Sequence, residues 1–220
     1  MLAVDSYNES YNESYNESYN QTATSLPIVE TFHSVQGEGA WTGTNAFFIR
    51  LAGCDVGCWF CDTKQSWNPK RHPHQTFDEL VQAAKMVNPA IVVITGGEPL
   101  MHDLTELTQK LRAQGLRTHL ETSGAHPFSG EFDWVTLSPK PFKSPHDSVY
   151  AHVNELKAVI AKSEDFAWAE QQAQQIPESA IRYLQPEWSR SESRSLIFEY
   201  ILQHPEWRMS LQTHKLLGIQ

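Results

Sequence analysis

The chain has 220 residues and a mass of 25.1 kDa, a length that suggests one domain. Its 17 basic and 26 acidic residues give a formal net charge of -9 at pH 7. This charge argues against a nucleic-acid partner, because nucleic-acid binders normally carry a basic face. Only three cysteines are present, and all lie between residues 54 and 61, which argues against a disulfide-stapled secreted scaffold.

The N-terminal segment is polar and repetitive. Residues 7–18 contain the sequence Tyr-Asn-Glu-Ser three times, and residues 19–21 begin a partial fourth copy. Such a tract cannot bury enough apolar surface to offset the entropy of ordering it. We therefore predict a disordered tail over residues 1–25 and a folded domain over residues 26–220.

Neither a secretory signal nor a membrane span is visible in the sequence. Residues 1–25 contain no basic residue and no apolar core of a signal peptide. The apolar run at residues 91–94 is far too short to cross a bilayer. We expect a soluble, cytoplasmic protein with no membrane partner.

Strands and helices alternate along the rest of the chain. Residues rich in β-branched and aromatic side chains predict strands, at 28–33, 46–51, 90–95, 116–121, 134–137, 181–184 and 207–212. Helices are predicted from Thr76, from Asp103, over 164–175 and over 191–203. The pattern at 155–160 fits a helix or a strand equally well.

Capping signals and the alternation of elements predict the fold. Thr76 with Glu79 has the spacing of a capping box, Asp103 with Glu106 repeats it, and Gly115 provides the stop of the second helix. Alternating β and α units predict a parallel sheet with right-handed crossovers. Because a complete eightfold barrel needs about 250 residues, we expect an α/β fold in the form of an abbreviated, partly open (β/α) barrel.

The three cysteines form one short loop directly after the strand predicted at 46–51. Active sites of such folds lie at the carboxyl ends of the strands. Three thiolates on one loop suit zinc or an iron–sulfur cluster. A structural zinc ion requires a fourth ligand, which any of the ten histidines could supply, whereas a cubane cluster held by three thiolates leaves one iron open. Three unrelated buried cysteines are the remaining alternative.

The spacing C-x3-C-x2-C, with Phe60 before the last cysteine, resembles the radical S-adenosylmethionine (SAM) superfamily. About 35 residues further on, the segment Thr95-Gly96-Gly97-Glu98-Pro99 ends the next buried strand and is similar to the superfamily's SAM-contacting turn. The resemblance implies a radical SAM barrel whose catalytic domain is residues 26–220. It also implies a 4Fe–4S cluster on Cys54, Cys58 and Cys61, with SAM on the open iron.

Four further segments narrow the resemblance. Residues 34–39, Arg50, the pair at 62–63 and residues 138–141 together resemble the 7-carboxy-7-deazaguanine synthase family of queuosine biosynthesis. The similarity runs from about residue 27 to the C-terminus. Only the polar N-terminal repeats depart from the family pattern, and their role stays open.

This resemblance implies a role for individual residues. Those implied to bind substrate are Val35, Gln36 and Gly37 through their backbone, Arg50 as a clamp on a carboxylate, and Thr95. Those implied to bind SAM are Phe60, Gly97, Ser138, Pro139, Lys140 and Gln185, with residues 121–124 near the SAM ribose. Thr63 is implied to ligate Mg²⁺. A salt bridge is the alternative for Arg50, and a cap or turn is the alternative for Thr63.

The implied activity is that of a carbon–nitrogen lyase, a rearrangement of a small molecule. A 5′-deoxyadenosyl radical would abstract hydrogen from C6 of 6-carboxy-5,6,7,8-tetrahydropterin, and ring contraction with loss of ammonia would give 7-carboxy-7-deazaguanine. No conventional general base is assigned. The resemblance also implies an electron donor such as a flavodoxin and a homodimer. A glycyl-radical activase and a non-enzymatic zinc-binding module are the competing interpretations.

Overall fold

The structure, a computed structural model, describes residues 24–219. The repeats, predicted to form a disordered tail, lie outside the described residues. The strands are β1 (Ser25–Val35), β2 (Asn45–Leu51), β3 (His74–Thr76), β4 (Ile91–Gly96), β5 (Thr118–Thr122), β6 (Trp134–Leu137), β7 (Glu155–Ile160), β8 (Ile181–Pro186) and β9 (Trp207–Met209). They form one sheet in the order β3-β1-β2-β4-β5-β6-β7-β8-β9.

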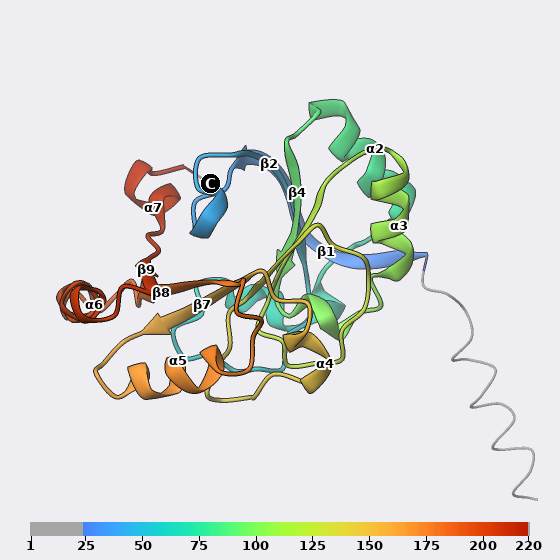
Figure 1. Ribbon diagram of the computed structural model, residues 1–220. Coiled ribbons are helices and arrows are strands. Elements are labelled where there is room, and N and C mark those ends of the chain that lie inside the picture. Colours follow the sequence, from blue (N-terminus) through green and yellow to red (C-terminus); the bar gives the residue numbers. More distant parts are fainter. Residues whose placement is uncertain (1–23, 220) are drawn as a thin grey trace, which may run out of the picture.

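Helices cover the outer face of this curved sheet (Figure 1). They are α2 (Phe77–Val87), α3 (Thr105–Ala113), α4 (Asp147–Tyr150), α5 (Asp165–Ala173) and α6 (Glu192–Gln203), whereas α7 (Thr213–Leu217) lies on the open, inner side beside the loop that follows β1. Short 3₁₀ turns are η1 (Gly39–Trp41), η2 (Lys64–Trp67), η3 (Pro69–Arg71) and η4 (Pro99–Met101). None of the described helices is long and apolar enough to cross a membrane.

From β2 to β9 the strands are parallel, as predicted, but one edge of the sheet is not. Strand β1 pairs antiparallel with both β2 and β3. The connection from β1 to β2 is only residues 36–44, closed by a hydrogen bond from Gln36 N to Thr44 O of 2.8 Å. Because a parallel pair needs a crossover of about a dozen residues or more, this short connection forces an antiparallel pair. The predicted parallel sheet of a partly open barrel is therefore confirmed from β2 to β9, and the antiparallel pairs at this edge make the whole sheet mixed.

The capping box at the start of α2 is confirmed, and the second capping signal is displaced. Thr76 N donates to Glu79 Oε2 at 2.7 Å, and Glu79 N donates to Thr76 Oγ1 at 3.3 Å. Asp103 Oδ1 accepts from Thr105 N at 2.9 Å, but α3 begins only at Thr105. Gly115 follows α3 with a φ of 75°, as a stop residue should.

Strand β4, near the middle of the sheet, is buried on both faces, so its first four residues are all apolar. Val92 and Ile94 of β4 belong to the large core beneath the helices. Ile91 and Val93 alternate with them and face a smaller cluster on the inner side. This two-sided burial explains the short, uninterrupted apolar run that predicted β4.

An aromatic floor closes the interior of the partial barrel beneath the carboxyl ends of the strands. Trp41 of η1 packs edge-on to His119 at 4.8 Å and to Trp134 at 5.6 Å between ring centroids. Burial lowers the pKa of His119 to about 4, so its ring is neutral at pH 7. Two residues further along β5, Glu121 lines a cavity above this floor.

Candidate active site

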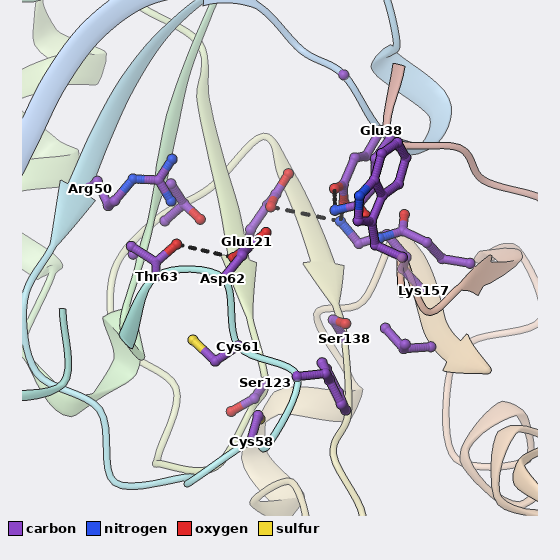
Figure 2. Close-up of a pocket in the computed structure, with 18 of the residues that line it drawn as sticks. Glu38, Arg50, Cys58, Cys61, Asp62, Thr63, Glu121, Ser123, Ser138 and Lys157 are labelled. Atoms are coloured by element: carbon purple, nitrogen blue, oxygen red, sulfur yellow. Dashed lines mark hydrogen bonds and ion pairs between the residues drawn. The ribbon is translucent and has the colours of Figure 1, made fainter. Parts of the chain in front are cut away.

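A cavity of about 310 Å³ lies where β2, β4, β5, β7 and β8 end, on the side where active sites of such folds are found. Residues from separate segments meet there (Figure 2). Of the residues assigned from the sequence, all but Pro139 line it: Val35, Gln36, Gly37, Arg50, Cys54, Cys58, Phe60, Cys61, Thr63, Thr95, Gly97, Ser138, Lys140 and Gln185. Pro139 lines an adjoining cavity of about 680 Å³ together with Phe60 and Lys140.

The cysteine loop has the character of a metal-binding loop. Cys54, Cys58 and Cys61 are free thiols, each partly buried at the cavity. Burial raises the pKa of the Cys54 and Cys58 thiols, so metal binding would have to displace their protons. Three unlinked thiols facing one cavity fit a cluster held by three thiolates.

The second motif packs directly against the loop that carries the cysteines. Gly97 N donates to Leu51 O at 2.9 Å, and Glu98 N donates to Gly53 O at 2.7 Å. A Cβ atom on Gly97 would overlap the carbonyl oxygen of Gly53 and crowd Cys54. Glycine is therefore required at position 97 by close backbone approach.

Glu98 joins this turn to the end of β5. Its side chain is fully buried and accepts from Leu100 N at 3.0 Å and Ser123 N at 2.8 Å. The hydroxyls of Thr122 and Ser123 also donate to it. Of residues 121–124, expected near the SAM ribose, 121–123 line the same cavity as the cysteines and Gly124 does not.

Arg50 and Thr95, assigned to substrate from separate segments, are partners in the β2–β4 register. Arg50 Nε forms an ion pair of 2.8 Å with Glu30, so the salt bridge considered for this residue is present. Its side chain is nevertheless only 23% exposed, and Figure 2 shows its guanidinium directed toward Thr63 and the cavity. Ion pairing and cavity lining coexist at this residue.

Thr63 immediately precedes η2 and lies two residues after the last cysteine. Its hydroxyl donates to Asp62 Oδ1 at 3.1 Å, and Asp62 Oδ2 lies 2.8 Å from Lys215 Nζ. Two oxygen-bearing side chains thus stand together at the cavity, in keeping with the oxygen ligands that Mg²⁺ prefers. The salt bridge also joins the cysteine loop to α7.

The loop at residues 35–37 offers fewer backbone groups than its sequence suggests. The N–H and C=O of Gln36 are both used inside the chain, by Thr44 O at 2.8 Å and Gly43 N at 2.7 Å. Gly37 O accepts from Thr213 N at 2.9 Å. Between residues 24 and 219 no partner is found for the Gly37 N–H, which makes it the loop's available donor.

A buried ion cluster in the cavity was missed by the sequence reasoning. Lys157 is 4% exposed, and its ammonium pairs with Glu38 and lies 3.7 Å from Glu121 Oε2. Gln36 Nε2 donates to Glu121 Oε1 at 2.7 Å, and Gln212 Nε2 donates to Glu38 Oε1 at 2.8 Å. The available signal was the single lysine inside the apolar run at 155–160.

Glu38 and Lys157 each stabilise the ionised form of the other. Burial alone would raise the pKa of Glu38, but the Lys157 ammonium outweighs it and lowers that pKa to about 2. Burial alone would lower the pKa of Lys157, yet Glu121, Glu38 and Glu155 raise it well above its ordinary value. The cavity wall therefore carries fixed charges at neutral pH.

The side of the cavity assigned to SAM carries a second, partly buried lysine. Lys140 Nζ donates to the carbonyl oxygen and the hydroxyl of Ser138, both at 2.6 Å. Burial lowers the pKa of Lys140 to about 8, with Cys58 opposing the change. Gln185 Oε1 accepts from Ser210 Oγ at 2.9 Å, which ties β8 to the segment after β9.

Comparisons with known proteins identify the family. The Radical SAM superfamily model matches residues 48–138. The 7-carboxy-7-deazaguanine synthases of Synechocystis sp. and Flavobacterium psychrophilum are 59% and 50% identical, over 89% and 88% of this chain and 94% and 92% of theirs. The crystal structure of QueE from Escherichia coli has a TM-score of 0.79 and 30% identity, covering 89% of this chain and 97% of that one. The chain therefore belongs to the 7-carboxy-7-deazaguanine synthase family of radical SAM enzymes.

Proposed function

We propose that this enzyme converts 6-carboxy-5,6,7,8-tetrahydropterin to 7-carboxy-7-deazaguanine with loss of ammonia, for queuosine biosynthesis. The observation that carries the proposal is the meeting of Arg50, Thr63 and Thr95 with the cysteine loop at one cavity. This chain carries these residues together, and it is 59% identical to the 7-carboxy-7-deazaguanine synthase of Synechocystis sp.. Neither a glycyl-radical activase nor a zinc-binding module accounts for an arginine and a threonine facing a small cavity beside the thiols.

The substrate half of the cavity would be built from β2 and β4. Arg50 would bind the substrate carboxylate, because a guanidinium matches a carboxylate in planar geometry and charge. Thr95, its partner in register, would donate its hydroxyl to the same substrate. Opposite them, Gln36 and Glu121 present an amide and a carboxylate suited to the amino and amide groups of a pterin ring.

The cofactor half would be built around the cysteine loop. Cys54, Cys58 and Cys61 would hold the 4Fe–4S cluster, and Gly97 would approach SAM through its backbone. Ser138, Pro139, Lys140, Gln185 and the Phe60 backbone would complete the SAM side. When bound, the cluster and SAM supply radical hydrogen-atom abstraction, and the chain's own residues orient the substrate and exclude water.

A magnesium ion would complete the substrate half. Thr63 would ligate Mg²⁺ through its hydroxyl, with Asp62 beside it. Few protein ligands suit this cation, which usually keeps several waters and takes the rest of its shell from substrate oxygens. Mg²⁺ and Arg50 would then act together on the carboxylate of the substrate.

Electrons and a second subunit would come from outside the described chain. An electron donor such as a flavodoxin would approach the cysteine loop, where the Trp59 side chain is 49% exposed. A homodimer would cover the apolar face of α6, where Phe198 and Leu202 are 59% and 71% exposed at i and i+4 spacing. Leu202→Asp should give a monomer in light scattering if that face is the dimer contact.

The experiment that tests the activity is an anaerobic incubation with reductant, SAM, Mg²⁺ and the carboxytetrahydropterin, followed by detection of ammonia and the deazapurine. Arg50→Ala and Thr63→Ala should lose turnover while keeping the absorption of the iron–sulfur cluster. Arg71→Ala and Thr42→Ala, at exposed positions outside the cavity, are matched controls that should retain turnover. Full activity in both site variants would show that the substrate and magnesium roles are wrong.

A further inference from the structure

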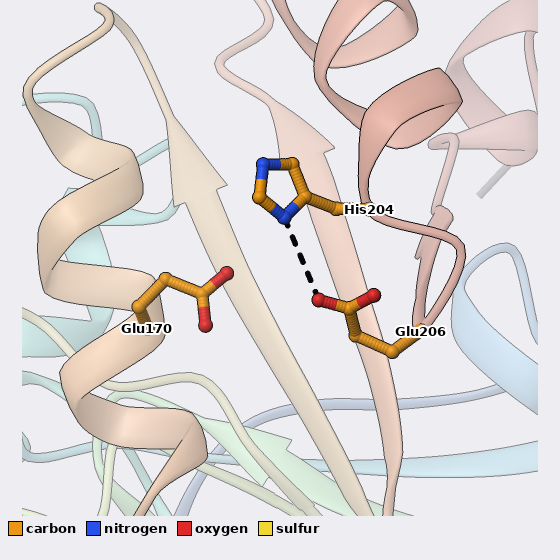
Figure 3. Close-up of side chains that lie close together, drawn as sticks. All are labelled: Glu170, His204 and Glu206. Carbon is orange, nitrogen blue, oxygen red and sulfur yellow. Dashed lines mark ion pairs between the residues drawn. The ribbon is translucent and has the colours of Figure 1, made fainter.

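Three potential metal ligands converge away from the catalytic cavity, between α5 and the end of α6 (Figure 3). Glu170 lies on α5, His204 follows the last turn of α6, and Glu206 lies just before β9. One ligand atom from each residue lies within 4.8 Å of the other two. None of the three lines the cavity that holds the cysteine loop.

Neutral donors fix the carboxylate of Glu170 without neutralising its charge. Its Oε1 accepts from Tyr200 OH at 2.8 Å and from Trp207 Nε1 at 2.7 Å. Trp207 is 1% exposed, so this donor is anchored in the core. Over residues 24–219 no lysine, arginine or histidine forms an ion pair with Glu170. The carboxylate is thus oriented by two outer donors, as metal-binding carboxylates are, and retains its negative charge.

Aromatic stacking fixes the orientation of the His204 imidazole. The ring of His204 stacks on Tyr200 with centroids 3.9 Å apart and planes at 11°. Tyr200 stacks in turn on Phe166 of α5 at 4.0 Å. The ring is therefore held beside Glu206, with Nδ1 3.5 Å from Oε1.

The resulting donor set is one imidazole nitrogen and two carboxylate oxygens, with a net negative charge. Imidazole and carboxylate together suit zinc and similar first-row ions. Three protein ligands leave the remaining position to water, and partial exposure of His204 and Glu206 gives an ion access. We propose that Glu170, His204 and Glu206 form a binding site for one divalent transition-metal ion of the Zn²⁺ type, separate from the iron–sulfur site.

An ion at this site would join α5 to the segment that leads into β9. That segment continues to Ser210 and Gln212, which bond to Gln185 and Glu38 at the catalytic cavity. The site would thus stabilise the C-terminal part of the sheet and take no part in the chemistry. We expect Zn²⁺ to raise the unfolding temperature of the protein, because a ligand that binds only the folded state stabilises it.

The test is a titration of the cluster-loaded enzyme with ZnCl₂ under anaerobic conditions and excess Mg²⁺, followed by calorimetry and by cluster absorption. The wild type should bind one Zn²⁺ with unchanged cluster absorption. Glu206→Gln and Glu170→Gln should weaken this binding by about tenfold or more, because each removes an anionic ligand while keeping side-chain shape. Glu206 is exposed, so the first variant should fold normally. His33→Gln and Glu178→Gln, at other exposed positions, should bind Zn²⁺ as the wild type does.

Two results would overturn the proposal. One is equal Zn²⁺ affinity in the wild type and Glu206→Gln. The other is Zn²⁺ uptake that proceeds only with bleaching of the cluster absorption, which would assign the ion to the cysteines. A rise in unfolding temperature that Glu206→Gln abolishes would support the site independently of enzyme activity.

Discussion

Replacement of Lys157 by methionine tests whether the buried ion cluster holds the cavity wall together. Methionine has similar length but no charge, so the variant leaves the partly buried carboxylates of Glu38 and Glu121 without their cation. The pKa of Glu38 lies at about 2 against an ordinary value of 4.5. At about 1.4 kcal/mol per pKa unit, this difference corresponds to about 3 kcal/mol. Loss of one partner of a buried pair costs about 3–5 kcal/mol in other proteins, which agrees.

The effect of Lys157→Met should depend on pH in a defined direction. A carboxylate with a lowered pKa stabilises the folded state above its ordinary pKa of 4.5, and that stability is lost as the pH falls toward about 2. In the variant, unopposed burial would raise the pKa of Glu38 instead. The destabilisation should therefore be largest near neutral pH and should shrink on acidification, as the unpaired carboxylates take up protons.

The assay is anaerobic urea unfolding of the cluster-loaded protein at about pH 7.5 and about pH 4.5. We expect Lys157→Met to lower the free energy of unfolding by about 3 kcal/mol at the higher pH and by less at the lower. Lys110→Met is the matched control, because Lys110 pairs with Asp78 at 2.8 Å on an exposed surface and should leave stability nearly unchanged. A loss in Lys157→Met no larger than in the control, or a loss independent of pH, would refute the reasoning.

Three further changes test the cavity itself. Arg50→Lys should lower kcat/KM by about 10-fold to 100-fold, seen in steady-state kinetics, because an ammonium cannot reproduce the planar guanidinium contact. An unchanged kcat/KM would contradict the clamp. Thr63→Ser, which keeps the hydroxyl that Thr63→Ala removes, should retain turnover with nearly the Mg²⁺ dependence of the wild type, measured as rate against Mg²⁺ concentration. Gly97→Ala should lower both iron content and SAM affinity, measured by iron analysis and calorimetry, because its Cβ would overlap Gly53 O. Wild-type iron and SAM binding would contradict that close approach.

Local signals predicted most strands, and long-range pairing explains where they failed. The ambiguous residues 155–160 form β7, whose buried side chains pack between its neighbours in the sheet. The strand predicted at 207–212 ends at Met209. Beyond it, Ser210 and Gln212 turn to bond with Gln185 and Glu38. A pattern of alternating residues cannot show that these polar side chains have partners far away in sequence.

The motifs located the cavity, but its internal charge balance could not be predicted. Cys54, Gly97 and Arg50 belong to segments with recognisable spacing, and all of them line the cavity. Lys157 has no motif around it, and its partner Glu38 is 119 residues away. Only the curvature of the folded sheet brings Lys157 and Glu38 together. The motifs therefore predict the residues that are expected to contact substrate and cofactor. They do not predict the ion cluster that supports those residues.

The lysines that line the cavity differ in whether a carboxylate forms an ion pair with them. Lys157 pairs with Glu38 and Glu121, and Lys215 pairs with Asp62. Lys140 is held only by the neutral oxygens of Ser138, and among residues 24–219 no carboxylate forms an ion pair with it. A local cation with no carboxylate partner offers its full charge to a small anion. Lys140 meets that condition beside the cysteine loop, so we expect anionic groups of a bound ligand to lie there despite the net charge of -9.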